Sequence, residues 1–90
     1  MNAPETNREP DAALALAALE WLLGDNVRAA RLLAVTGLTP DGLRTRLEEP
    51  ALLAAILAFL EAHEPDLIAC AEAIGHSPAA LVNARVSLTQ

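Results

Sequence analysis

The 90-residue sequence has no lysine and no tyrosine, and its only aromatic residues are Trp21 and Phe59. A core must therefore be built from aliphatic side chains, and strand-forming residues are scarce. Hydrophobic residues still make up 53% of the chain, and most of them are alanine and leucine. This composition argues against a sheet protein and predicts an all-α fold.

Positive charge is also scarce, because six arginines face twelve acidic residues and the net charge is −6. An average field of this sign repels phosphate polyanions and anionic lipid surfaces. Direct binding to nucleic acid is therefore not expected, and neither is binding to a membrane.

The sequence has one cysteine, Cys70, which cannot form a disulfide within the chain and predicts a reducing, cytoplasmic location. The longest apolar run, residues 51–60, is about half the length that a membrane-spanning helix needs, roughly 20 residues. Acidic residues before the apolar segment that follows Pro10 argue against a secretion signal.

Catalytic patterns are missing as well. The glycines are too dispersed to form a phosphate-binding loop, and Cys70 has no neighbouring base in the sequence. The segment "HEPD" at residues 63–66, with His76 beyond it, lacks the spacing of metal ligands. We therefore predict a non-enzymatic protein with no metal site and no cofactor.

Prolines, glycines and capping residues divide the chain into helical segments. We predict a disordered leader over residues 1–9 and a single helical domain over residues 10–90, folded as a compact bundle of five or six short helices. The expected helices are 10–23, 26–36 with Asp25 or Asn26 as its cap, 40–48, 50–62, 65–74 and 78–88.

The first five expected helices carry apolar residues that mark a buried face, and the helix over residues 50–62 is apolar almost all the way round. We therefore place that helix at the centre of the bundle. The apolar residues expected to mark buried faces elsewhere are Leu14, Leu16, Leu19, Trp21, Leu22 and Leu23 in the first helix, Val27, Ala30, Leu33 and Ala34 in the second, Leu43 and Leu47 in the third, and Leu67, Ile68, Ala71 and Ile74 in the fifth.

The chain also repeats itself at an interval of about 38 residues. This shift aligns the glycines, capping residues and prolines of "GLTPDGLR" (37–44) with those of "GHSPAALV" (75–82), and it aligns Trp21 with Phe59. The pattern predicts two copies of a three-helix unit that share one core.

The same two stretches resemble the turn of a DNA-binding helix-turn-helix. In that motif the residue four positions before the glycine is usually small, and here it is Leu33 in the first copy and Ala71 in the second. The first copy has Arg44 and Arg46 flanked by acidic residues, and the second offers only Asn83 and Arg85. We interpret both stretches as helix caps, with a DNA-binding regulator as the alternative.

Two further features have two interpretations each. Arg28, Arg31, Arg44 and Arg46 lie close together in the sequence and form either a solvated surface or a face that binds an acidic partner. Cys70 is either a small buried hydrophobic residue or a redox sensor that joins two chains, which would require exposure and a stabilised thiolate.

The elements "TGLTP", "EPALLAAILAFL" and "AEAIGHSP" resemble a small family of alphaproteobacterial helical proteins of unknown function, from about Asp11 to Leu88. This family in turn resembles a redox-responsive regulator that inhibits decatenation by binding topoisomerase IV. The resemblance implies a protein-binding regulator and, through Cys70, a homodimer joined by a disulfide.

The expected function is thus that of a non-catalytic regulatory protein acting by protein–protein interaction. The resemblance implies a more specific function, which is inhibition of a DNA-processing enzyme such as topoisomerase IV.

Overall fold

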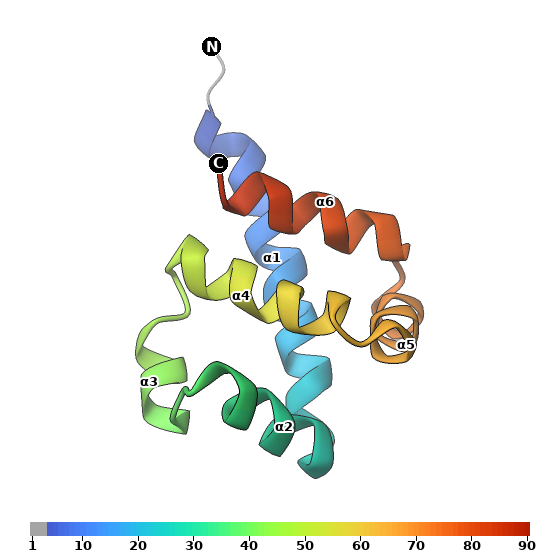
Figure 1. Cartoon of the computed structure of the whole chain (residues 1–90). Coiled ribbons are helices and arrows are strands. Elements are labelled where there is room, and N and C mark those ends of the chain that lie inside the picture. The colour runs from blue at the N-terminus through green and yellow to red at the C-terminus, as the bar shows by residue number, and fades with distance from the viewer. Residues whose placement is uncertain (1–3) are drawn as a thin grey trace.

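The computed structural model describes residues 4–90, with side chains from Pro10 onward, and this part of the chain contains six helices and no strand. The helices are α1 (Pro4–Leu23), α2 (Asn26–Thr36), α3 (Pro40–Thr45), α4 (Pro50–Glu61), α5 (Glu64–Ile74) and α6 (Pro78–Leu88). They pack into one compact globule (Figure 1). The predicted all-α bundle is confirmed.

Most predicted helix ends are confirmed within a few residues, but α1 begins at Pro4 and encloses Pro10. The sequence predicted Pro10 in the first turn of the helix, where its missing N–H removes no backbone hydrogen bond. Inside the helix it removes one backbone hydrogen bond. Residues 1–3 of the expected disordered leader lie outside the described residues, and α3 ends at Thr45, before the predicted end near Glu48.

The predicted caps explain why the remaining boundaries are sharp. Asp25, Thr39 and Ser77 precede α2, α3 and α6, and each side chain accepts a hydrogen bond from a backbone N–H in the first turn. Gly37 and Gly75 end α2 and α5 in the left-handed conformation, with φ of 74° and 78°. This conformation favours glycine because glycine has no Cβ.

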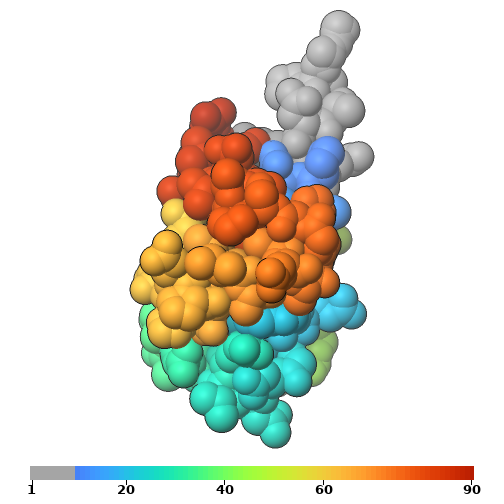
Figure 2. Space-filling model, turned by 90° about the vertical axis from the view of Figure 1, so that its right-hand side faces the viewer, coloured from blue at the N-terminus to red at the C-terminus, as the bar shows by residue number. Residues whose placement is uncertain are grey.

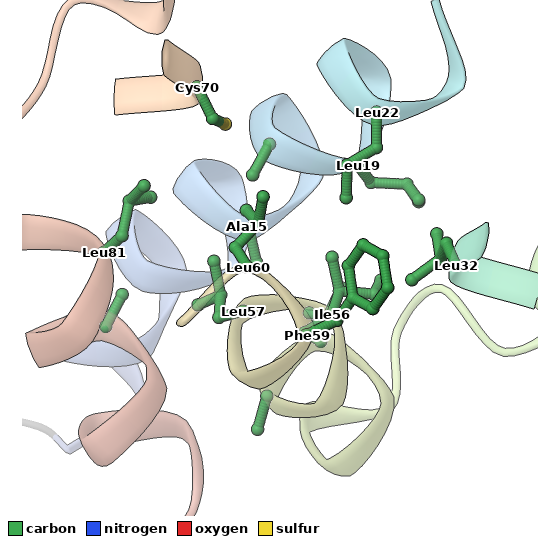
Figure 3. Close-up of a cluster of buried hydrophobic side chains, with 14 of the residues drawn as sticks. Ala15, Leu19, Leu22, Leu32, Ile56, Leu57, Phe59, Leu60, Cys70 and Leu81 are labelled. Carbon is green, nitrogen blue, oxygen red and sulfur yellow. The ribbon is translucent and has the colours of Figure 1, made fainter. Parts of the chain in front are cut away.

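Helix α4 forms the centre of the bundle, as its apolar sequence predicted. It packs against α1, α2, α5 and α6, and Figure 3 shows side chains of these helices converging around it. Its buried residues are Leu52, Leu53, Ala54, Ile56, Leu57, Phe59 and Leu60.

The predicted repeat is visible in both helix bounds and burial. Helix α5 begins and ends 38 positions after α2, and α6 begins 38 positions after α3. Residues at equivalent positions are buried together. These pairs are Ala15 and Leu53, Ala18 and Ile56, Leu19 and Leu57, Leu22 and Leu60, Leu32 and Cys70, and Leu43 and Leu81.

The third helices of the two units differ. Helix α6 has 11 residues and packs against α1, α4 and α5, whereas α3 has 6 residues and makes no comparable contact with any described helix. Two residues favour the shorter helix. Pro50 stands where α6 has Leu88 and holds the preceding residue in an extended conformation, and Gly42 replaces the better helix former Ala80.

The predicted buried face of α2 is largely wrong. Val27 is 64% exposed, Ala30 and Ala34 are also exposed, and Leu32 is the residue that is fully buried. Apolar residues lie on most sides of α2, so their spacing does not determine how the helix is rotated. Leu16 and Leu23 of α1 and Ile68 of α5, also expected to be buried, are exposed as well.

Candidate protein-binding surface

An apolar groove runs along one side of α1 beside Leu47 and continues between α1, α2 and α3, where the short α3 leaves part of α1 open. It consists of two adjoining hollows of about 700 and 440 Å³ that share Leu19, Leu23 and Leu47. We call it the α1–α3 groove. Its lining residues are Ala13, Leu16, Ala17, Leu19, Glu20, Leu23, Gly24, Ala29, Leu33, Pro40, Leu43, Arg44 and Leu47.

Two leucines on the α1 side of this groove are accessible to solvent. Leu16 is 39% exposed and Leu23 is 45% exposed, although both lie on the helix that contacts most of the bundle. The charged residues of the lining are Glu20 and Arg44. The groove therefore presents aliphatic surface with one charge of each sign.

The four arginines singled out in the sequence do not form one face. Arg28 and Arg31 of α2 point to α5, whereas Ala29 and Leu33, on another side of α2, line the groove together with Arg44. Arg44 pairs with Asp41 at 3.1 Å, and Arg46 pairs with Glu49 at 3.0 Å. The structure thus separates the predicted basic patch into two parts, and acidic residues neutralise each part.

Asp66, in the first turn of α5, is the centre of the part formed by Arg28 and Arg31. Its carboxylate lies 3.5 Å from Nε of Arg28 and 3.3 Å from Nη1 of Arg31, and the residue is only 8% exposed. The Arg28 guanidinium also lies over the Trp21 ring, 4.1 Å from its centre. Figure 2 shows this side of the molecule, with α5 between α2 and α6.

This cluster was not predicted from the sequence, in which Asp66 was considered only as part of the "HEPD" segment. A signal was available, because Arg28 and Asp66 carry opposite charges at equivalent positions of the two repeat units. The cluster ties α2 of one unit to α5 of the other, and we assign it a structural role.

Cys70 is fully buried on α5 and points into the core (Figure 3). Burial raises the pKa of its thiol to about 11; the positive charge of Arg28 opposes this effect, and the negative charge of Asp66 adds to it. The interpretation as a buried hydrophobic residue is confirmed. The redox and dimer interpretation of Cys70 required exposure and a stabilised thiolate, and the structure provides neither.

The two helix-turn-helix-like stretches do not present free basic residues. In the second copy α6 packs against α1 and α4, and Arg85 binds the carboxylate of Glu61 on α4. In the first copy α3 carries Arg44, which pairs with Asp41. Both stretches act as the helix caps that the sequence predicted.

The described residues contain neither a metal-binding cluster nor a membrane-spanning helix. Among these residues, no three His, Cys, Asp or Glu side chains gather in a way that could hold a metal ion. In the same part of the chain, every helix is too short or too polar to cross a membrane.

The fold and the groove define a small all-α protein of two unequal three-helix units, one of which leaves an apolar surface open. The chain belongs to the family described as "Protein of unknown function (DUF3572)", whose model matches residues 8–90. This agrees with the resemblance to a helical family of unknown function, and it does not extend to the topoisomerase IV inhibitor. No curated protein and no solved structure matches the chain.

Proposed function

We propose that this protein is a non-catalytic regulator that acts by binding a partner protein through the α1–α3 groove. The observation that supports the proposal is the exposure of Leu16 and Leu23 within a continuous aliphatic surface. Apolar grooves on protein surfaces are common interaction sites, since exposing aliphatic side chains to water is unfavourable.

The partner that the sequence resemblance implies is a DNA-processing enzyme such as topoisomerase IV, and we place the interaction in the cytoplasm. The resemblance and the single cysteine support these two details. The alternative, a DNA-binding regulator, gains no support from the paired arginines of α3 and α6.

The proposal is tested by affinity capture from cells of the source organism with wild-type protein and with a Leu16→Glu/Leu23→Glu variant. The variant carries two carboxylates in the groove, and a partner that covers the groove must remove their hydration. We therefore expect the variant to capture no partner. Val86→Glu, which alters a 41% exposed residue on α6 outside the groove, is the matched control. A partner retained by the groove variant would contradict the proposal.

Purified topoisomerase IV provides the specific test. We expect wild-type protein to inhibit decatenation and the groove variant to leave it unchanged. Unchanged decatenation with wild-type protein would remove this enzyme as the partner.

A further inference from the structure

We infer that the α1–α3 groove binds an amphipathic α-helix of the partner protein, which lies along α1 as α6 lies along α4. This inference rests on the proposed function and specifies the structural class of the partner segment. The internal repeat supports this inference, because the second unit contains a helix, α6, at the equivalent place.

The surface of α4 that faces α6 identifies the equivalent surface of α1. Glu61 on α4 binds Arg85 of α6, and Leu57 and Ala54 lie one and two turns before Glu61 on the same side of α4. Both of these residues are buried.

The positions 38 residues earlier are Leu23, Leu19 and Leu16, and all three line the α1–α3 groove. The groove is therefore the counterpart of the α6-binding surface. Helix α3 is too short to cover it, which leaves Leu16 and Leu23 exposed.

The buried face of α6 indicates the pattern that an occupant needs. Helix α6 buries Leu81, Ala84 and Leu88, which are spaced as i, i+3 and i+7 along one side. An occupant helix should carry small and large aliphatic residues at this spacing. Because Leu23 stands where α4 has Glu61, we expect an apolar residue in the occupant where α6 has Arg85.

Charge adds a second criterion. Glu20 lies on the groove wall, is exposed and has no ion-pair partner among the described residues. Together with the net charge of −6, it favours a basic residue at the edge of the occupant helix.

A second copy of this chain fits the groove less well. The α6 of a second copy is already packed against its own α1 and α4, so it would have to leave its core to enter the groove. Two copies also carry the same net charge of −6, which opposes their association.

The test is selection of helical peptides from a phage-displayed library against the wild-type protein. We expect the enriched sequences to share aliphatic residues at i, i+3 or i+4, and i+7, with a basic residue at one edge. A labelled synthetic copy of an enriched peptide should bind Leu16→Glu and Leu23→Glu at least roughly tenfold more weakly, the loss typical of a central contact residue.

Two variants serve as controls. Val86→Glu should bind this peptide as wild type does, and Glu20→Gln should weaken binding and its dependence on salt. Circular dichroism and thermal unfolding confirm that each variant is folded before binding is compared.

Three outcomes would overturn the inference: no enriched peptide, enriched peptides without the helical spacing, or binding that Leu16→Glu and Leu23→Glu leave unchanged. A wild-type dimer in sedimentation equilibrium that Leu23→Glu converts to monomer would assign the groove to a second copy instead. A captured partner that cross-links to the groove through a non-helical segment would leave the proposed function standing. If peptides bind the groove but cells yield no captured partner, the inference of a helical ligand would be supported and the proposed function would not.

Discussion

At the scale of single residues, Asp66 connects parts of the molecule that are distant in the sequence. It is nearly buried, it lies at the positive end of the α5 dipole, and it faces Arg28 and Arg31 of α2. A carboxylate with this little exposure must recover its lost hydration from charged neighbours. The cluster therefore holds α2 and α5 in one relative position.

Replacing Asp66 by asparagine tests this role. The substitution keeps the shape but leaves the two arginines without their shared carboxylate, so we expect the free energy of unfolding to fall by about 1–2 kcal/mol. Asp41→Asn is the matched control, since the Asp41–Arg44 pair is highly exposed and should contribute less than about 0.5 kcal/mol. Urea unfolding measures both variants, and an equal loss in both would contradict the assignment.

Cys70 makes stability depend on pH in a window where few other groups titrate. Burial raises its pKa from an ordinary value of about 9 to about 11, so the protonated thiol stabilises the fold fully below pH 9. This contribution is lost as the pH rises from about 9 to about 11. The chain has no lysine and no tyrosine to titrate in the same range.

We therefore expect the unfolding free energy of the wild type to fall more steeply between pH 9 and 11 than that of Cys70→Ala. Urea unfolding at several pH values measures the difference in slope, which does not depend on the stability that the alanine itself costs. Parallel pH profiles would show that the thiol ionises without penalty. Slow reaction of the native thiol with a labelling reagent at pH 8, and fast reaction in denaturant, should accompany the wild-type profile.

At the scale of helices, the two glycine C-caps illustrate how local chemistry ends an element. Gly37 and Gly75 occupy equivalent positions of the two units and share a left-handed backbone. A Cβ at either glycine would meet no atom within 4 Å, so any cost of a side chain there is conformational. Gly24, after α1, has no positive φ.

Alanine substitutions separate these cases. We expect Gly37→Ala and Gly75→Ala each to lower the unfolding free energy by about 1 kcal/mol, because alanine is strained in the left-handed conformation. Gly24→Ala should change it by less than about 0.5 kcal/mol, since its Cβ would make an ordinary contact at 3.4 Å with the Trp21 carbonyl oxygen. Thermal unfolding measures all three, and similar losses would contradict the conformational explanation.

At the scale of the whole molecule, the difference in length between α3 and α6 has the largest consequence. Two units of nearly equal length share one core, but only the second covers the outer side of its first helix with a long third helix. The molecule is left with an open aliphatic groove on a surface whose net charge is −6. These two properties are the reason that we propose a protein partner rather than a nucleic acid.

A binding assay with duplex DNA tests the alternative function, that of a DNA-binding regulator. Five arginines pair with acidic residues, so few positive charges are available to bind phosphates. They are Arg28, Arg31, Arg44, Arg46 and Arg85. We expect no mobility shift of duplex DNA even at about 50 mM salt. A complex whose affinity falls steeply with salt would restore the DNA-binding alternative.

Much of the fold was predictable from the sequence, and little of the candidate site was. The caps at Asp25, Thr39 and Ser77 and the apolar character of α4 led to correct helices and a correct centre of the bundle. The buried face of α2 was wrong, because its apolar residues lie on several sides. The groove was missed because Leu16 and Leu23 are indistinguishable in sequence from core leucines.

The sequence by itself determined most of the helix ends, the exceptions being the start of α1 and the end of α3, and that two similar units share a core. These features depend on interactions between residues a few positions apart and on a regular spacing of apolar residues. Only the tertiary structure decided which leucines of α1 stay exposed, that Arg28 and Arg31 face α5 while Arg44 lines the groove, and that Cys70 is inaccessible. Each of these depends on contacts between helices distant along the chain, which no local pattern specifies.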